Sequence, residues 1–308
     1  MKKFQFTFLC ALMLIAPLRG IAANRFGQAF TTPQAAVSAL TVALNSHDSS
    51  QLMQIFGPGG EELQNPDRVQ ATNEMDVFAK ALNTTNQLVR DSSEKYELEV
   101  GTDAWPFPVP IVEKDGQWYF DTDEGKEELL NRRVGRNELD VLKSMRAYVD
   151  AQREYASQDR NGDSVLEYAQ RISSSPGKKD GLYWSMDLDG SMSPLGPLVA
   201  EAQTEGYQAR VNGQETSHTP FHGYYFKILK RQGSSAPGGS YNYVINGHMI
   251  AGFGLIAWPA DYGNSGVMTF IVNQQGRVYQ RDLGKNTSTI APAMNEYNPG
   301  AGWMQSRD

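Results

Sequence analysis

The chain has 308 residues, of which 40% are hydrophobic and 10% aromatic, and its formal net charge is −7. This composition indicates a globular protein and excludes a disordered chain. Because acidic residues are in excess and no block of lysine and arginine occurs, we expect no nucleic-acid partner.

The first 23 residues have the pattern of a secretory signal peptide. Lys2 and Lys3 precede an apolar run over 4–18, and small residues follow up to Ala22 and Ala23. The run is shorter than the roughly 18 residues of a membrane span, and no second such run follows. We therefore predict cleavage near Ala22 or Ala23, a periplasmic or secreted protein, and no membrane span.

Cleavage would leave an acidic chain without cysteine. Cys10 is the only cysteine and lies within the signal, so we expect no disulfide, thiolate nucleophile or sulfur ligand for a metal. Loss of Lys2, Lys3 and Arg19 from the 28 basic residues leaves 25 against 35 acidic residues. The remaining chain is long enough for two domains with substantial cores.

The first half of the mature chain predicts helices followed by strands. Helical spacing and caps predict helices over 33–45, through Leu52 and Ile55 up to Gly57, and over 74–82. Alternation predicts antiparallel strands over 96–100, 109–112 and 118–120. We therefore predict an N-terminal α+β domain over 24–135.

The segment Trp105–Pro110 contains three alternating prolines. Proline disfavours a central strand, so we predict an extended edge segment or a polyproline segment, with Trp105 and Phe107 on one side. We expect these aromatic rings to cover one end of the N-terminal core. A platform for a ligand is the alternative.

The second half predicts one long helix and a series of strands. A helix over 121–133 is expected to be interrupted at Gly135, and a longer one to run from Arg136 to about Ser157. Its predicted apolar face consists of Leu139, Leu142, Met145, Val149, Gln152 and Ala156. Strands are predicted over 223–230, 241–245, 252–258, 267–272 and 277–281, with a hairpin turn over 273–276. We predict a second domain, over 136–308, in which the long helix packs on an antiparallel β-meander.

Several motifs together resemble one family. The motifs are Trp105–Pro108, Asn131–Leu139, Ala147–Ala156 and Gly223–Phe226. With them the chain, from about Phe30 to Trp303, resembles the domain of unknown function 2950 family of exported bacterial proteins. The resemblance implies a secreted or periplasmic protein of the same layout and brings no activity with it.

Two weaker resemblances cover parts of the chain. The helix Ala147–Ala156, the loop with Gly162 and Tyr168, and Lys179–Tyr183 resemble the soluble heads of type IV pilins and type II secretion pseudopilins. Those proteins carry a hydrophobic helix continuous with the head, whereas here a charged domain precedes it. With Ala36–Leu40 and Asp115–Asp121, the first domain is similar to cone-shaped α+β domains of the nuclear-transport-factor-2 type.

The segment Asp159–Glu167 is the sharpest local signal of a site. Asp159, Asn161 and Asp163 offer oxygen ligands at the first, third and fifth positions, the Val165 carbonyl at the seventh and Glu167 at the ninth. This spacing is typical of a calcium loop, in which Leu166 would anchor the loop in the core. Two departures are Ser164, where such loops use glycine, and Gln170, where a bidentate Glu is usual. The alternative is a polar turn after a helix.

Other residue patterns point less clearly to chemistry. His218 and His222 are four residues apart, but Pro220 between them argues against a helical zinc site. The run Ser175–Lys178 imitates a serine–lysine pair, although Pro176 prevents the helical turn that such chemistry needs. The arginines 132, 133 and 136 are expected to pair with the acids Glu127, Glu128, Glu138 and Asp140, with binding of an anionic group as the alternative.

Two function classes follow from these observations. The first is a non-enzymatic binding or assembly module of the cell envelope, which uses exposed aromatic residues of the meander to engage an envelope protein or polymer. The second is an extracytoplasmic hydrolase that acts on a glycan-type polymer with carboxylates between the two domains.

Overall fold

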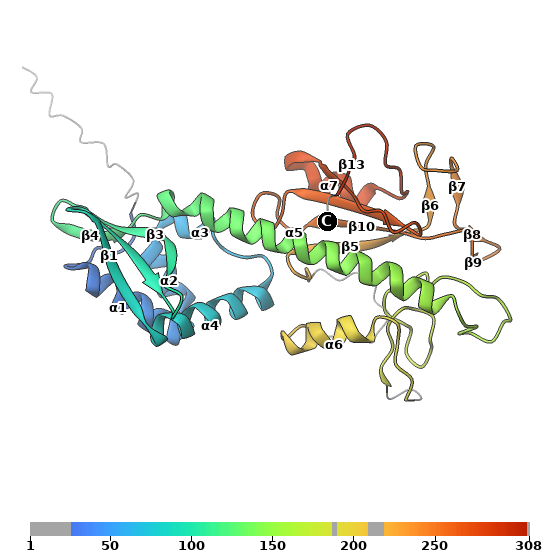
Figure 1. Cartoon of the computed structure of the whole chain (residues 1–308), viewed down its shortest axis with the longest axis horizontal. Helices are drawn as coiled ribbons and strands as arrows, with labels where there is room; N and C mark the ends of the chain where they lie inside the picture. The colour runs from blue at the N-terminus through green and yellow to red at the C-terminus, as the bar shows by residue number, and fades with distance from the viewer. Residues whose placement is uncertain (1–25, 187–189, 209–218, 307–308) are drawn as a thin grey trace, which may run out of the picture.

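The computed structural model describes residues 26–186, 190–208 and 219–306, so the predicted signal peptide lies outside the described residues. The molecule is elongated, and the helix α5 (Thr122–Tyr155) runs through both of its halves (Figure 1). Within the described ranges, no helix is both long and apolar enough to cross a membrane.

Helices open the N-terminal half, as predicted. The helix α1 (Pro33–Asn45) begins after Thr32, whose hydroxyl accepts a hydrogen bond from the Ala35 N–H at 3.1 Å. The other helices here are α2 (Ser49–Phe56), the single turn α3 (Pro58–Glu61) and α4 (Arg68–Thr84). Gly57 ends α2 with a φ of 66°, which glycine adopts at no steric cost.

The N-terminal sheet is antiparallel and has the order β1-β2-β3-β4. Its strands are β1 (Asn86–Ser92), β2 (Lys95–Val100), β3 (Trp105–Lys114) and β4 (Gln117–Phe120). β1 was not predicted from the sequence, because most of its residues are polar and show no apolar alternation.

The segment Trp105–Pro110 is the first part of β3, which lies between β2 and β4 in the order of the sheet. The strand β4 pairs only with Ile111–Lys114, so the proline-containing part of β3 has a strand partner on one side alone and lies at an edge, as predicted. The missing proline N–H groups therefore cost fewer ladder hydrogen bonds than in a fully paired strand. The ring of Phe107 is buried in the N-terminal core, as expected, while Trp105 is exposed at its margin.

The helix α5 is continuous, so the predicted interruption at Gly135 is wrong. Asp121 caps its start, where its carboxylate accepts a hydrogen bond from the Glu124 N–H. A Gly within a helix costs only about 1 kcal/mol relative to Ala, and packing at both ends of α5 outweighs this. The predicted face is buried at Leu142, Met145, Val149 and Gln152, but Leu139 is 62% exposed.

The C-terminal sheet is the predicted meander, in the order β13-β12-β11-β10-β5 with every neighbouring pair antiparallel. Its strands are β5 (Tyr224–Leu229), β10 (Gly254–Pro259), β11 (Met268–Asn273), β12 (Tyr279–Asp282) and β13 (Met304–Gln305). Two small hairpins lie between β5 and β10, namely β6 (Arg231–Gln232) with β7 (Tyr241–Asn242), and β8 (Val244–Ile245) with β9 (His248–Met249). The turn 273–276 joins β11 to β12, as predicted.

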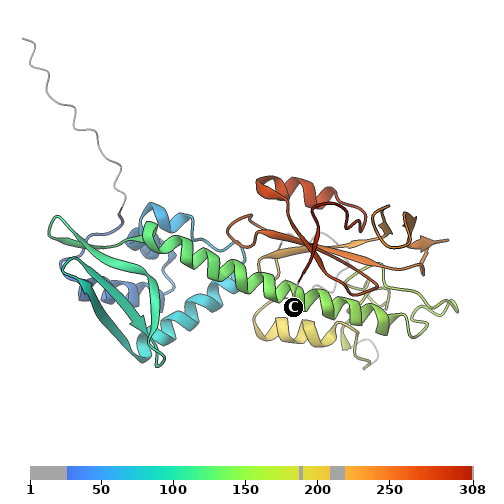
Figure 2. The same ribbon diagram turned by 45° about the horizontal axis from the view of Figure 1, so that its top comes forward.

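Three further elements complete this half. They are α6 (Gly196–Thr204), the short helix η2 (Gly284–Asn286) and α7 (Thr287–Ala293), none of which was predicted. The helix α6 lies next to α5 (Figure 2). Its residues Leu198 and Val199 pack against the buried cluster that also contains Met145 and Tyr148 of α5.

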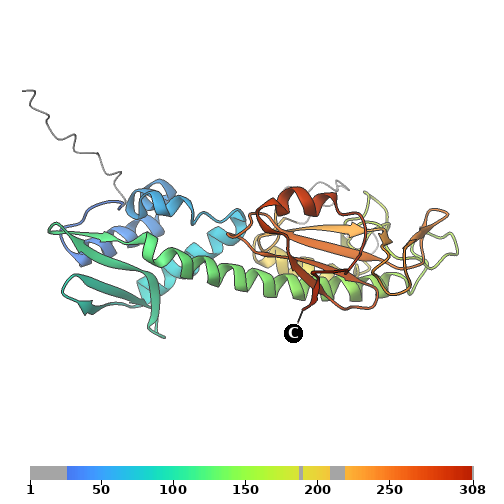
Figure 3. The ribbon, with the colours of Figure 1, turned by 90° about the horizontal axis from the view of Figure 1, so that it is seen from above.

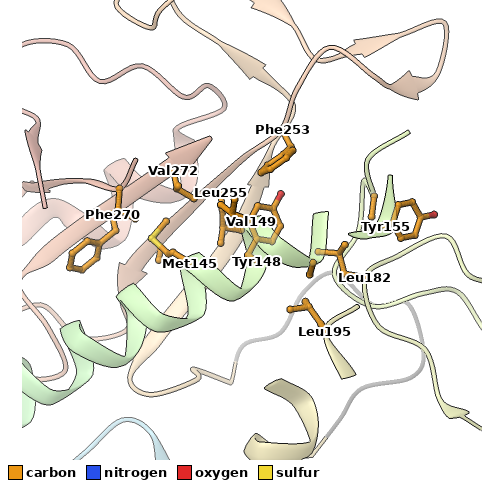
Figure 4. Close-up of a cluster of buried hydrophobic side chains, with 14 of the residues drawn as sticks. Met145, Tyr148, Val149, Tyr155, Leu182, Leu195, Phe253, Leu255, Phe270 and Val272 are labelled. Atoms are coloured by element: carbon orange, nitrogen blue, oxygen red, sulfur yellow. The ribbon is translucent and has the colours of Figure 1, made fainter. Parts of the chain in front are cut away.

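Helices cover both faces of the C-terminal sheet (Figure 3). Leu255 and Val272 pack toward Met145 and Tyr148 of α5 (Figure 4). Their strand neighbours Ile256 and Ile271 lie in a second cluster, with Ala291 and Tyr297. The alternation of side chains along β10 and β11 therefore fills two cores, which explains why these strands are apolar throughout.

Candidate cation site at the end of the long helix

The loop after α5 is fixed to the helix by a buried glutamine. The Ala169 N–H donates to Gln152 Oε1 at 2.8 Å, and Gln152 Nε2 donates to the Ala169 carbonyl at 2.8 Å. Both residues are buried. The loop therefore leaves α5 and returns to it at a defined place, at the end of the molecule far from the N-terminal half (Figure 1).

Asp159 shapes the turn through its carboxylate. Its Oδ2 accepts a hydrogen bond from the Ser164 N–H at 2.9 Å, and its Oδ1 accepts from the Gly162 and Asn161 N–H groups at 2.7 and 3.2 Å. These backbone hydrogen bonds, with that from Ser164 the strongest, hold the pKa of Asp159 below its usual value. Asp159 thus acts on the backbone of the loop.

Ser164 adopts the conformation for which calcium loops use glycine at this position. Its φ is 67°, in the left-handed region that side chains other than glycine rarely adopt. The departure noted in the sequence at this position therefore leaves the backbone path unchanged.

Three potential ligand side chains converge beside this turn. One ligand atom from each of Asp163, Glu167 and His248 lies within 4.8 Å of the others. His248 Nδ1 is 3.2 Å from Glu167 Oε2 and 3.5 Å from Asp163 Oδ2. The side chains of Asp163 and His248 are each 33% exposed and that of Glu167 is 16% exposed, so an ion could enter from solvent.

Asn161 bridges the two carboxylates of this cluster. Its Nδ2 donates to Asp163 Oδ2 at 2.7 Å and to Glu167 Oε1 at 3.0 Å. Two close carboxylates repel each other, and the donated amide N–H groups offset that repulsion. The same amide turned by half a rotation would present its oxygen to the same place, as a ligand for a cation.

The structure thus brings together Asn161, Asp163 and Glu167 of the five predicted ligands. Asp159 is not in the cluster of ligand atoms, and Val165 joins the turn through its N–H, which donates to Asp163 Oδ1 at 2.8 Å. The prediction that Leu166 anchors the loop in the core is wrong, because its side chain is 59% exposed.

His248 was not predicted as part of this site. It lies in the β8–β9 hairpin, and Gln170 holds that hairpin against the loop by donating to the Gly247 carbonyl at 2.6 Å. The Tyr168 N–H also donates to the Met249 carbonyl at 2.8 Å. Contacts between segments so distant in the chain leave no signal in local spacing.

Carboxylates lie between the two halves of the molecule, as the hydrolase hypothesis requires, and the first of them is Asp67. Asp67 is fully buried, and its Oδ2 accepts from the Tyr207 hydroxyl at 2.7 Å and from the Gly223 N–H at 3.0 Å. Asn137 of α5 accepts from Gln70 and donates to the Ser265 carbonyl. These bonds join α4 and α5 to the C-terminal half.

His222 lies at the same junction beside two other carboxylates. Its Nε2 is 3.3 Å from Glu205 Oε2, and its Nδ1 is 3.8 Å from Asp140 Oδ2. His218, the other histidine of the weighed zinc pair, lies outside the described residues.

The remaining sequence candidates take structural roles. The Ser175 hydroxyl is hydrogen-bonded to Asp180 at 2.8 Å. Arg132 pairs with Glu128 and Arg136 with Glu74. Arg133, whose pKa is lowered by burial, donates to Asn264 and to the Leu63 carbonyl. The expected pairing is thus confirmed for Arg132 with Glu128, whereas the partner of Arg136, Glu74, is not one of the predicted acids.

Comparison with known proteins identifies the family of the chain. No curated protein and no solved structure matches the chain, so the resemblance of the C-terminal half to pilin heads stays a prediction. The family model described as a protein of unknown function, DUF2950, matches residues 27–306. This match spans most of the sequence, and the chain therefore belongs to the DUF2950 family.

Proposed function

We propose that this protein is an exported, non-enzymatic binding or assembly module of the cell envelope, and that the end of its C-terminal half binds a divalent cation. The observation that carries the cation site is the convergence of Asp163, Glu167 and His248 ligand atoms within 4.8 Å of one another. Export is supported by the signal-like pattern of residues 1–23.

Calcium fits this group best. The oxygens of Asp163 and Glu167, with the side-chain oxygen of Asn161, are the hard ligands that calcium prefers. The remaining positions would be filled by water, because the site is open to solvent. His248 is the one donor that favours a first-row metal such as zinc, and zinc is therefore the competing ion.

A cation here would link the loop to the β8–β9 hairpin. Glu167 comes from the loop and His248 from the hairpin, and the two side chains are in contact. Binding to this arrangement would stabilise it by about 2.7 kcal/mol at a hundredfold excess over the dissociation constant.

Aromatic side chains contribute less to the binding surface than the sequence suggested. Among the described aromatic residues, only Trp105 and Tyr241 count as exposed, at 38% and 37%. Tyr224, Tyr243 and Tyr297 are fully buried. The proposal therefore rests on the cation site and not on an aromatic surface.

Thermal unfolding of the mature protein tests the cation site. We expect millimolar calcium to raise the melting temperature relative to chelator, and the double variant Asp163→Asn, Glu167→Gln to lose that increase. Asp150→Asn, an exposed acid of α5, is the matched control and should keep it. An unchanged melt in calcium would reject the calcium site, and a zinc response lost in His248→Ala would identify zinc instead.

The binding role has its own test. Crosslinking in envelope extracts should recover a partner with the wild-type protein in calcium, and less of it with the double variant or in chelator. Equal recovery with the wild type in calcium, with the double variant and in chelator would show that partner binding does not depend on the cation.

The rival function is hydrolysis of a glycan polymer at the junction. The observation in its favour is His222 between Glu205 and Asp140. Release of soluble sugars from peptidoglycan or polysaccharide, lost in Glu205→Gln and Asp140→Asn, would support it, and no release from any polymer would reject it.

A further inference from the structure

A concave site lies on the other side of the C-terminal sheet from α5. It has a volume of about 600 Å³ and lies between the end of α7, β6, β12 and the segment 294–303. Its polar lining includes Arg231, Arg281, Asn295, Glu296 and Asn298, and Trp303 also lines it. This volume is in the range of cavities that hold small organic ligands.

The positive charge of this cavity exceeds its negative charge. Arg231 is paired with Glu296, with Nη2 3.3 Å from Oε2. Arg281 has no acidic partner in the ion pairs of the described residues, and its one hydrogen bond there runs from Nη1 to the Ala301 carbonyl at 3.4 Å. Its guanidinium is therefore the group that an anionic ligand would neutralise.

The guanidinium of Arg281 lies beside the backbone of Gly302. A Cβ at Gly302 would lie 3.3 Å from Arg281 Cζ, and the φ of Gly302 is 85°. The guanidinium thus lies against a bare glycine, and Arg281 is exposed, so a ligand in the cavity can reach it. A planar guanidinium suits a carboxylate, because the two groups can form two parallel hydrogen bonds.

The other wall offers amide groups and an indole ring. Asn295 Oδ1 accepts from Lys227 at 3.2 Å, which leaves its Nδ2 to donate. Asn298 is held by the Ser235 N–H at 2.8 Å and by Glu296 at 3.4 Å. Trp303 is partly exposed while it packs against the cluster around Tyr297. An indole face with nearby amides is suited to the apolar face and hydroxyl groups of a sugar ring.

We infer that this cavity binds a saccharide unit that carries a carboxylate. The carboxylate would pair with Arg281, and the sugar ring would lie on Trp303 with its hydroxyl groups at Asn295. Such a unit could come from the lactyl sugar of peptidoglycan or from a uronic acid of another polysaccharide. The site is separate from the cation cluster, and neither inference depends on the other.

Calorimetry on the mature protein with matched sugars tests this inference. The probes are glucuronic acid against glucose, N-acetylmuramic acid against N-acetylglucosamine, and acetate alone. We expect at least one acid to bind about tenfold or more tightly than its neutral partner, and acetate to bind more weakly than that acid. Which acid binds more tightly distinguishes the two sources.

Variants connect the binding to the cavity. Arg281→Gln should remove the preference for the acid, and Trp303→Phe should weaken both members of the preferred pair. Arg277→Gln, an exposed arginine outside the cavity lining, is the control and should bind as the wild type does. Circular dichroism melts confirm that each variant is folded. Equal affinity for acid and neutral sugar, a preference that survives Arg281→Gln, or no binding at all would overturn the inference.

Discussion

His248 Nδ1 lies 3.2 Å from Glu167 Oε2, although 81 residues separate them in the chain. The loop after α5 and the β8–β9 hairpin meet at this pair, and the bond from Gln170 to Gly247 holds them together. A cation bound here would therefore act on two segments at once. Its effect should appear in the stability of both, not in the loop alone.

The buried side chain of Gln152 should be the strongest single support of the loop. Gln152→Leu would leave the N–H and carbonyl of Ala169 without their partners in a buried place. We expect a loss of about 2–4 kcal/mol in the free energy of unfolding, measured by urea denaturation. Gln203→Leu, at an exposed position of α6, is the control, and an equal loss there would contradict this account.

The junction should depend on Asp67 more than on any one of its donors. Asp67→Ala removes the acceptor of the Tyr207 hydroxyl and of the Gly223 N–H, while Tyr207→Phe removes one donor. We expect losses of about 2–4 kcal/mol for the first and about 1 kcal/mol for the second, by chemical denaturation. A larger loss for Tyr207→Phe than for Asp67→Ala would show that the buried Asp67 side chain destabilises the fold.

Two glycines of α5 should respond in opposite ways to alanine. A Cβ at Gly125 would lie 2.5 Å from the Pro108 carbonyl oxygen of β3, whereas nothing lies within 4 Å of one at Gly135. We expect Gly125→Ala to lower stability by about 1–3 kcal/mol and Gly135→Ala to raise it by about 0.5–1 kcal/mol. Thermal unfolding of the two variants, compared with the wild type, measures both changes in stability. A loss of stability in Gly135→Ala would indicate that α5 needs flexibility there.

The carboxylate of Asp159 should stabilise the loop at neutral pH and lose that effect in acid. Its pKa is lowered in the folded protein by the Ser164 N–H and its neighbours. The contribution is therefore complete above the pKa of the unfolded chain, which is about 3.9, and is lost as the pH falls through the lower folded value. A carbon-13 titration should show a midpoint below that of a peptide of residues 157–168. Equal midpoints would mean that these hydrogen bonds do not hold in solution.

Local sequence signals accounted for much of the fold. The cap at Thr32 and Pro33 predicted the start of α1, and the alternating segments of the second half predicted β5, β10, β11 and β12. The class, α+β with a long helix on a meander, is confirmed. The prediction of a helix interruption at Gly135 was wrong, because the weak local preference of glycine against the helix is outweighed by packing at both ends of α5.

The candidate site was only half visible in the sequence. Spacing alone brought Asn161, Asp163 and Glu167 together, because a tight turn places alternate residues on one side. His248 enters through tertiary contacts of a hairpin, which no local pattern records. The same holds for Arg281 and Trp303, which lie 22 residues apart and meet only at one cavity.

A crystal structure in saturating calcium tests the cation site most directly. We predict an ion with oxygen ligands from Asp163 and Glu167 at about 2.3–2.6 Å, and an Asn161 amide turned so that its oxygen faces the ion. The result that would contradict the account is an Asn161 Nδ2 still bridging the two carboxylates, as it does at 2.7 and 3.0 Å here, with no ion between them.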